Sequence, residues 1–338
     1  MAGRVRRRRP GGGAGQVNVL VITGLTLPAV SEEDVARVQD AAGPGAKVTV
    51  VGRVREAVAI AGDVEVVLGV VPPPLLEAAP KLRWVHATAS GVDGFLYPAF
   101  RDGDVVLTGE KGLVGGHLAD HAFGLLLALT RRIAAAVRLG AGGWDHRERM
   151  RQEELELESL VMGIVGFGGT GRAMARRARA FGMTCLAVDE PGATPGDGVA
   201  EVWPTSRLHD LLGASDVVAV CCPLTDSTRG LFDDARFAAM KPGAILLNVT
   251  RGEVVDGDAL VRALSSGTLG GAGLDVAPLE PLPAEHPLWG FENVVMTPHT
   301  AGASQHRARR NLERFCDNLR RYRNGDELVG VVDKQAGF

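Results

Sequence analysis

Short apolar runs rich in β-branched residues alternate along the chain with stretches whose apolar residues recur at helical spacing. The first series of such runs occupies residues 17–22, 47–51, 64–69 and 83–87. Runs of this length, separated by helical stretches, are typical of βαβ units, whose strands pair in parallel. Ser31 followed by Glu32 and Glu33 predicts the start of a helix, because a serine hydroxyl caps the first turn and acids favour the positive end of the helix dipole.

A second series follows a stretch of helical periodicity at 118–139, which predicts one long continuous helix. Six further strands are expected at 160–165, 184–188, 216–222, 244–249, 271–276 and 293–297. Helices are expected at 169–181, 206–213, 233–239 and 256–265, with a last amphipathic helix at about 303–322. The pattern therefore predicts an α/β protein whose second series forms a doubly wound parallel sheet.

Length and charge narrow the class of protein. A chain of 338 residues is typical of two domains, each with its own core. The first sixteen residues carry five arginines and no acid, and without them the net charge of −3 becomes −8. Nucleic-acid binding is not expected, because it requires a basic folded face. Since Pro-Gly-Gly-Gly follows the arginines where an export signal needs an apolar segment, residues 1–16 are expected to be a disordered basic leader.

Membrane spans, metal sites and disulfides are not expected either. The charge-free stretch at 122–130 is far shorter than the roughly 20 residues that a membrane helix needs. The four cysteines, Cys185, Cys221, Cys222 and Cys316, show neither metal-ligand spacing nor the density of a disulfide scaffold. A reducing cytoplasm is therefore the expected compartment.

A glycine-rich motif, GFGGTG, lies between a predicted buried strand and a predicted helix. Gly166 permits a tight turn, Gly168 lets the backbone approach a pyrophosphate, and Gly171 lets helix and strand pack closely. Asp189 ends the next strand, where its carboxylate would bind the ribose hydroxyls of NAD and repel the 2′-phosphate of NADP. NAD is therefore the expected cofactor, although a glycine-rich turn without a ligand remains the alternative.

Three ionisable residues each follow the carboxyl end of a predicted strand, the edge where open α/β sheets bind ligands: Arg251, Glu280 and His299. A carboxylate beside an imidazole stabilises the imidazolium form, so a Glu–His pair suits a general acid near neutral pH. The planar fork of an arginine suits a substrate carboxylate. Each of the three residues alone could have a structural role. Their common position at one edge of the sheet favours a catalytic role.

Six ordered motifs resemble the D-isomer-specific 2-hydroxyacid dehydrogenases, over about residues 17–332. They are SGVDG (90–94), GFGGTG (166–171), PLTDSTRGL (223–231), NVTRGEVVD (248–256), LDVAPLEPLP (274–283) and TPHTAG (297–302). The resemblance implies that Arg251 binds substrate and that Glu280 and His299 form the acid/base pair. It further implies a substrate-carboxylate cradle of backbone N–H groups at Ser90, Gly91 and Val92. Cofactor contacts are implied for Gly166, Gly168, Gly169, Thr170, Gly171, Asp189, Pro223, Thr228, Thr250 and Asp275.

The resemblance also implies a domain organisation. A flavodoxin-like substrate-binding domain is expected to comprise residues 17–113 and 303–338, with a Rossmann NAD-binding domain, 114–302, inserted into it. A homodimer formed through the NAD-binding domains is expected. Trp144 either reaches the active site of the neighbouring subunit or covers an interface. His86 could line the substrate pocket, whereas His117 and His121 are expected to belong to the long helix and to take no part in the chemistry.

The expected activity is NADH-dependent reduction of a small 2-keto acid, such as glyoxylate or hydroxypyruvate, to the D-2-hydroxy acid. In that reaction His299 protonates the developing alkoxide while Arg251 orients the substrate. The alternative is a non-catalytic NAD(H)-sensing interaction protein, because corepressors built on this fold retain the same three residues. Formate oxidation is disfavoured, because formate dehydrogenases of this family carry Gln at the position of Glu280.

Overall fold

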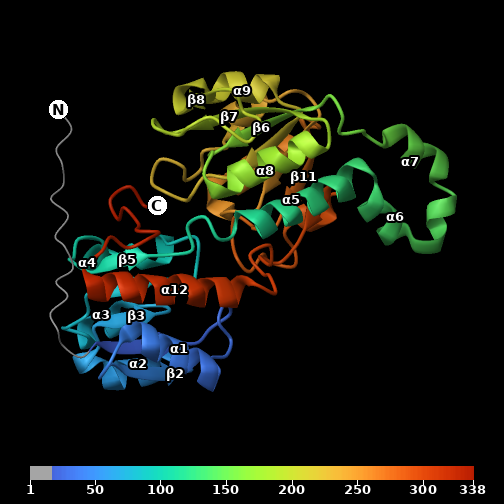
Figure 1. Cartoon of the computed structure of the whole chain (residues 1–338). Helices are drawn as coiled ribbons and strands as arrows, with labels where there is room; N and C mark the ends of the chain where they lie inside the picture. The colour runs from blue at the N-terminus through green and yellow to red at the C-terminus, as the bar shows by residue number, and fades with distance from the viewer. Residues whose placement is uncertain (1–16) are drawn as a thin grey trace. The chain divides into compact units, whose positions relative to one another are not determined.

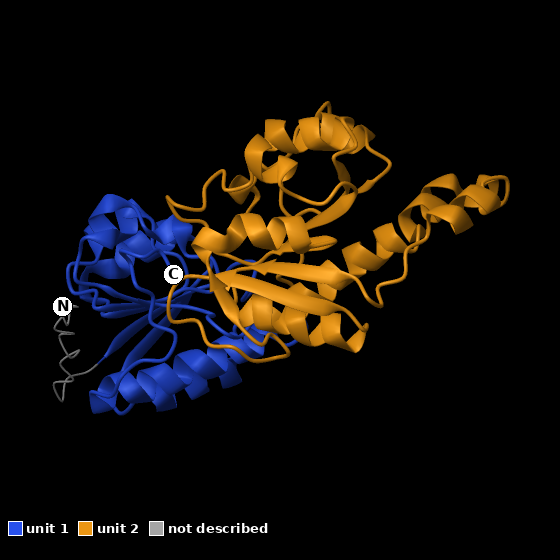
Figure 2. Cartoon of the chain, turned by 90° about the horizontal axis from the view of Figure 1, so that it is seen from above, with its two compact units in different colours: residues 1–113, 304–338 blue, residues 114–303 orange. Residues whose placement is uncertain are grey.

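The computed structural model describes residues 17–338, so the expected basic leader, 1–16, lies outside the described residues. The described chain forms two compact units, shown in Figure 2. Unit 1 comprises residues 17–113 and 304–338, and unit 2 comprises residues 114–303. Unit 2 is therefore inserted into unit 1, and the chain passes between the units twice.

Unit 1 is built on a five-stranded sheet in the order β2-β1-β3-β4-β5, with every pairing parallel. This is the flavodoxin-like strand order. The strands are β1 (Asn18–Ile22), β2 (Lys47–Val51), β3 (Val66–Leu68), β4 (Trp84–His86) and β5 (Val106–Thr108). The helices are α1 (Glu32–Ala42), α2 (Val54–Ile60), α3 (Pro73–Ala78), α4 (Pro98–Arg101) and α12 (Arg307–Asn324), with the 3-10 turns η1 (Ala61–Asp63) and η2 (Asp93–Phe95).

The C-terminal segment completes the core of unit 1. The apolar face of α12 is buried, and Phe315 packs against Trp84 of β4 with ring centroids 5.2 Å apart. Figure 1 shows α12 lying along this unit. Beyond the helix, Val332 N–H donates to the Leu107 carbonyl at 2.9 Å and Val331 bridges Thr108, so the edge of β5 is covered. Residues distant in sequence therefore stabilise the same sheet.

Unit 2 is built on a seven-stranded sheet in the order β12-β11-β10-β9-β6-β7-β8, again with every pairing parallel. The strands are β6 (Val161–Val165), β7 (Thr184–Asp189), β8 (Val202–Pro204), β9 (Val217–Val220), β10 (Ala244–Asn248), β11 (Leu269–Leu274) and β12 (Val294–Met296). The order reverses between β6 and β9, the position where doubly wound sheets bind dinucleotides.

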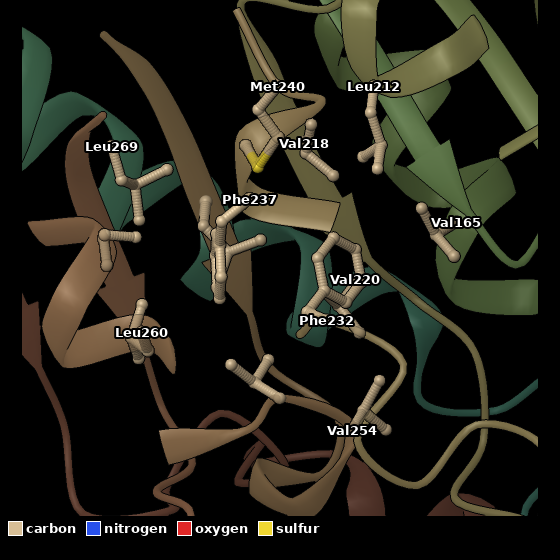
Figure 3. Packing of buried hydrophobic residues seen from close by; sticks show 14 of the residues in the cluster. Val165, Leu212, Val218, Val220, Phe232, Phe237, Met240, Val254, Leu260 and Leu269 are labelled. Carbon is tan, nitrogen blue, oxygen red and sulfur yellow. The ribbon is translucent and has the colours of Figure 1, made fainter. Parts of the chain in front are cut away.

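Helices cover both faces of this sheet. They are α5 (Gly115–Thr130), α6 (Ile133–Leu139), α7 (Arg147–Glu153), α8 (Gly169–Ala180), α9 (Leu208–Ala214), α10 (Asp234–Ala238) and α11 (Gly257–Ser265), with the 3-10 turns η3 (Gly140–Trp144), η4 (Thr205–Arg207), η5 (Gly252–Val254) and η6 (Pro287–Gly290). Figure 3 shows one layer of the core, a buried cluster to which α9, α10 and α11 contribute Leu212, Phe237 and Leu260 and β9 contributes Val218 and Val220. Side chains of α5 and α8 form a second buried cluster with β6.

The expected continuous helix at 118–139 is wrong. The helix α5 ends at Thr130 because the Thr130 carbonyl accepts the N–H of Leu155, and Arg132 adopts a left-handed conformation with φ 52°. The chain resumes as α6, which buries no side chain and, with α7, forms an arm that stands away from the sheet in Figure 1. Within residues 17–338, no helix combines the length and apolar character needed to cross a membrane.

Other boundaries differ less. The strands β5 and β8, of three residues each, were not expected, and the last helix begins at Arg307, four residues later than the pattern indicates. The expected fold class is confirmed: both units are parallel α/β sheets, one flavodoxin-like in strand order and one of the Rossmann type.

Candidate active site and cofactor site

Three adjacent strands of unit 2 end next to the expected reactive residues. The chain leaves β10, β11 and β12 and reaches Arg251, Glu280 and His299, respectively, within six residues of each strand end. Because the strands are neighbours and parallel, the three loops lie at one edge of the sheet, the edge that binds ligands in open α/β folds.

The structure pairs His299 with Glu280. The distance from His299 Nδ1 to Glu280 Oε2 is 2.7 Å, and Glu280 Oε1 accepts the N–H of Ala277 at 3.0 Å. An ionised carboxylate only accepts hydrogen bonds, so the imidazole donates through Nδ1. The side chains are 45% and 40% exposed within the described chain, so the second ring nitrogen, Nε2, can exchange a proton with a ligand.

His299 lies in a turn of unusual backbone conformation. Its φ is 53°, in the left-handed region that residues other than glycine rarely occupy. The turn is tied to Asp275 at the end of β11, whose carbonyl accepts the N–H of His299 at 2.7 Å. The Asp275 carboxylate accepts the N–H groups of Thr300 at 2.8 Å and Ala301 at 2.7 Å. These bonds define the direction in which the imidazole leaves the backbone.

Arg251 is held by its own turn. Buried Asn248 donates from its side-chain amide to the Arg251 carbonyl at 2.8 Å, and its amide oxygen accepts the N–H of Thr250 at 3.1 Å. Gly252 packs so closely that an added Cβ would lie 1.7 Å from the Ala277 carbonyl oxygen. The turn that carries Arg251 therefore contacts the loop that leads to Glu280.

The glycine-rich loop joins β6 to α8. Gly166 has φ 95°, and a Cβ there would meet the Cys222 backbone nitrogen at 2.6 Å. A Cβ on Gly171 would lie 2.1 Å from the Gly166 carbonyl oxygen, whereas one on Gly168 would meet no described atom within 4 Å. The helix α8 begins without a side-chain cap, so the N–H groups around Gly169 and Thr170 are offered to an anion.

Asp189 ends β7 and already contacts the glycine-rich loop. One carboxylate oxygen accepts the N–H of Phe167 and the other accepts the N–H of Glu190, both at 2.7 Å. Arg172 of α8 lies beside the same loop: its guanidinium is 4.7 Å from the centre of the Phe167 ring, and it donates to the Thr194 carbonyl at 2.6 Å. Arg172 also forms an ion pair with Asp197 at 3.5 Å, so this cation is balanced by an acid other than Asp189.

Hydroxyl groups follow the ends of β9 and β10. Thr228 Oγ1 donates to the Pro223 carbonyl at 2.7 Å and accepts the N–H of Thr225 at 2.8 Å. Thr250 Oγ1 lies 3.2 Å from Asn248 Oδ1. These residues lie at the same edge of the sheet as the glycine-rich loop.

Within residues 17–338, no group of three or more His, Cys, Asp or Glu side chains is arranged to hold a metal ion.

The expected substrate cradle follows β4 in unit 1. Ser90 is exposed, Gly91 is half-buried, and the Val92 side chain is buried. Among the described residues, the N–H groups of these three make no hydrogen bond to the protein. Unused N–H groups in sequence are suited to a carboxylate. His86, by contrast, is fully buried in the core of unit 1 and does not line a pocket there.

Comparison with known proteins identifies the family. Residues 123–301 match the family model described as D-isomer specific 2-hydroxyacid dehydrogenase, NAD binding domain. Glyoxylate reductase from Korarchaeum cryptofilum is 35% identical over 297 residues, which cover 86% of this chain and 87% of that protein. The chain belongs to the D-isomer-specific 2-hydroxyacid dehydrogenase family.

Two further members of this dehydrogenase family illustrate its range. The chain is 36% identical to (S)-sulfolactate dehydrogenase from Chromohalobacter salexigens, over 73% of this chain and 79% of that protein. A crystal structure of NADPH-dependent glyoxylate/hydroxypyruvate reductase from Sinorhizobium meliloti, in complex with NADP and sulfate, has a TM-score of 0.76. It is 27% identical and covers 96% of this chain and 100% of that chain.

Sequence reasoning on this 2-hydroxyacid dehydrogenase missed residues that support the site. Asn248 lies within the NVTRGEVVD motif but shows its function only through the hydrogen bonds across its turn. His121 was assigned to a helix without chemistry, yet its Nε2 lies 2.7 Å from Thr297 Oγ1, 176 residues away in sequence. Contacts of such sequence separation leave no local pattern, so only the folded chain shows them.

Proposed function

We propose that this dehydrogenase uses NADH to reduce a small 2-keto acid to the D-2-hydroxy acid, and that it catalyses the reverse oxidation. The observation that carries the proposal is the His299–Glu280 pair, 2.7 Å apart, at the sheet edge that also holds Arg251 and the glycine-rich loop. The names of the relatives support a small 2-keto acid, and glyoxylate and hydroxypyruvate are the first substrates to test.

The residues at this edge fit a dinucleotide. The open space at Gly168 and the uncapped start of α8 suit a pyrophosphate. We assign cofactor contacts to Gly166, Gly168, Gly169, Thr170, Gly171, Asp189, Pro223, Thr228, Thr250 and Asp275. When bound, the reduced nicotinamide supplies the hydride that the substrate carbonyl carbon accepts.

His299 is the general acid of the proposed reaction. Glu280 accepts a hydrogen bond from Nδ1–H and stabilises the imidazolium, so the Nε2 proton is the one delivered to the oxygen of the substrate carbonyl. The bond from Ala277 N–H to Glu280 keeps the carboxylate in place as the imidazole changes charge. In the oxidation direction the same nitrogen accepts the hydroxyl proton.

Arg251 and the loop of unit 1 bind the substrate. The Arg251 guanidinium orients the substrate through charge-assisted hydrogen bonds, and the N–H groups of Ser90, Gly91 and Val92 bind the substrate carboxylate. Both interactions place the carbonyl carbon for hydride transfer, and such positioning accounts for much of a rate enhancement.

Asp189 favours NADH over NADPH, because its carboxylate accepts ribose hydroxyl groups and repels a 2′-phosphate. Since a related reductase uses NADPH, both cofactors need to be assayed in parallel. Asp189→Ser removes the repelling charge, and the ratio of kcat/KM with NADH to that with NADPH is expected to fall about 10- to 100-fold. A wild-type enzyme that prefers NADPH would contradict this assignment.

We also propose that the protein is a homodimer formed through the arm of unit 2. In the described chain Ile133 is 50%, Val137 76% and Trp144 78% exposed, and Trp144 lines a hollow of about 300 Å³ together with Ala136 and Met150. Large apolar side chains exposed on an arm are typical of an interface. A second copy of the chain is the proposed partner.

The decisive experiment is NADH oxidation with a panel of 2-keto acids that differ in side-chain size and charge. His299→Ala is expected to lower kcat by about 10²- to 10⁴-fold without weakening NADH binding, because only the proton donor is removed. His209→Ala, an exposed histidine of α9 in the same unit, is the matched control and should leave kcat unchanged. Full turnover by His299→Ala would reject the proposal, and NADH binding without turnover by the wild type would favour the NAD(H)-sensing alternative.

A further inference from the structure

A buried carboxylate lies beneath the turn that bears His299. Asp275 is 1% exposed, and its side chain accepts hydrogen bonds from Thr300 N–H, Ala301 N–H and Thr297 Oγ1, the last at 2.6 Å. A buried charge is stable only where donors surround it, so the segment 297–301 folds around this carboxylate. The fold of this turn therefore depends on the Asp275 carboxylate, and the buried carboxylate depends on the donors of the turn.

The direction of the hydrogen bonds defines a role for His121. Thr297 has one hydroxyl proton and gives it to Asp275, because an ionised carboxylate can only accept. The Thr297 oxygen must then accept from His121 Nε2, which lies 2.7 Å away. His121 Nε2 also lies 3.4 Å from Asp275 Oδ1. His121 therefore carries its proton on Nε2 and donates it into the network.

The helix α5 holds His121 at this position. A Cβ on Gly273 of β11 would lie 2.9 Å from Leu125 Cβ, so the glycine permits α5 to approach the strand closely. His121 lies one turn before Leu125 on the same helix and is 25% exposed. Asp275 follows Gly273 by two residues, so the close approach places the imidazole beside the carboxylate.

We propose that His121 is a positioning residue for the reaction, acting through Thr297 and Asp275 on the turn that bears His299. This inference rests on the proposed function, in which His299 is the proton donor. The left-handed backbone of His299 persists only if its surroundings hold it, and the bonds to Asp275 are the restraint. Without the donor from His121, the Thr297 oxygen keeps only its bond to Asp275, and the turn is held less firmly.

Four variants test the proposal. His121→Phe removes the donor, whereas His121→Gln places an amide N–H near the position of Nε2. Thr297→Val removes the hydroxyl, whereas Thr297→Ser retains it. The removal variants are expected to lower kcat about 10- to 100-fold, as is typical of residues that orient a reactive group, with KM for NADH changed less than about twofold. The conservative variants should recover most of kcat.

The solvent deuterium isotope effect on kcat separates positioning from simple loss of folded enzyme. A misplaced His299 makes proton delivery more rate-limiting, so the isotope effect should rise in His121→Phe and Thr297→Val. A smaller fraction of folded enzyme lowers kcat and leaves the isotope effect unchanged. Hydrogen exchange of the 297–301 segment should increase in the same two variants.

Three results would overturn the inference. They are an unchanged kcat in His121→Phe, an equal loss in the Gln and Phe variants, and a lower kcat with an unchanged isotope effect. The proposed function is tested separately by the wild type and His299→Ala. A wild type without turnover would overturn the proposed function and the inference together, whereas an active wild type with an unaffected His121→Phe would overturn the inference alone.

Discussion

Acidification from pH 7 to pH 5 is expected to destabilise unit 1 through one buried side chain, His86 of β4. The residue is fully buried, its Nδ1 lies 2.7 Å from Thr108 Oγ1, and its ring packs 5.7 Å from that of Phe315. Burial, helped by the positive charge of Arg314, lowers the pKa of His86 from 6.5 to about 3. The folded protein therefore keeps this imidazole neutral where the unfolded chain protonates it.

The sign and size of the effect follow from proton linkage. Well above pH 6.5 neither state binds the proton and the stability is fully present. As the pH falls through 6.5, His86 becomes protonated in the unfolded state, whereas in the folded state it stays neutral down to about pH 3. Protonation of the unfolded state alone lowers the free energy of unfolding. The decline is about 1.4 kcal/mol per pH unit, which amounts to about 2 kcal/mol between pH 7 and pH 5.

His86→Phe removes the titration and keeps a ring against Trp84 and Phe315. Because His86 Nε2 has no hydrogen-bond partner among the described residues, the variant loses only the bond between Nδ1 and Thr108, and it should be less stable than the wild type by about 1 kcal/mol at pH 7. The assay is urea unfolding at both pH values, with unit 1 followed through hydrogen exchange of β4 and β5 peptides. If acidification destabilises wild type and variant equally, the assigned role of His86 is wrong.

Three further predictions follow from close contacts and exposed surfaces. Gly252→Ala should lower kcat/KM at least about 10²-fold in a steady-state assay, because the added Cβ would displace the Ala277 carbonyl and with it the turn that carries Arg251. Gly290→Ala is the control, because a Cβ there meets no described atom within 4 Å. Lys334→Met should lower the free energy of unfolding by about 1–3 kcal/mol in thermal denaturation, because Lys334 donates to the carbonyls of Phe100, Gly103 and Val105. Lys81→Met, which breaks an exposed ion pair with Asp63, is the control and should leave the free energy of unfolding nearly unchanged. Val137→Glu combined with Trp144→Ser should convert the proposed dimer to a monomer in sedimentation velocity; an unchanged sedimentation coefficient would exclude the arm as the interface.

The helix expected at 118–139 shows what apolar periodicity cannot predict. Ile133, Val137 and Leu139 continue the apolar spacing of α5, so the sequence predicts one helix. The structure turns the chain at Arg132 and leaves these side chains exposed on the arm. An apolar spacing predicts that a helix has an apolar face, but the surface that this face packs against is a tertiary property. Strands β5 and β8 were also missed, although the equally short β3, β4 and β12 were expected.

The site residues could be predicted from the sequence because each lies next to the end of a strand. Parallel strands all end at the same edge, so a residue just beyond a strand end is placed in space by topology alone. Arg251, Glu280 and His299 are of this kind. The supporting residues are not: His121 lies in the middle of a helix, and its contact with Thr297 depends on how closely α5 approaches β11.

Sequence alone determined the two parallel sheets, the glycine-rich loop and the order of reactive residues, because alternation of strands and helices and the stereochemistry of glycine are local properties. Tertiary structure alone decided that the helix breaks at Arg132, that His86 is sealed in a core as a neutral imidazole, and that Asp275 holds the turn of His299. These features depend on burial and on hydrogen bonds between residues far apart in the chain, and neither exists until the chain has folded.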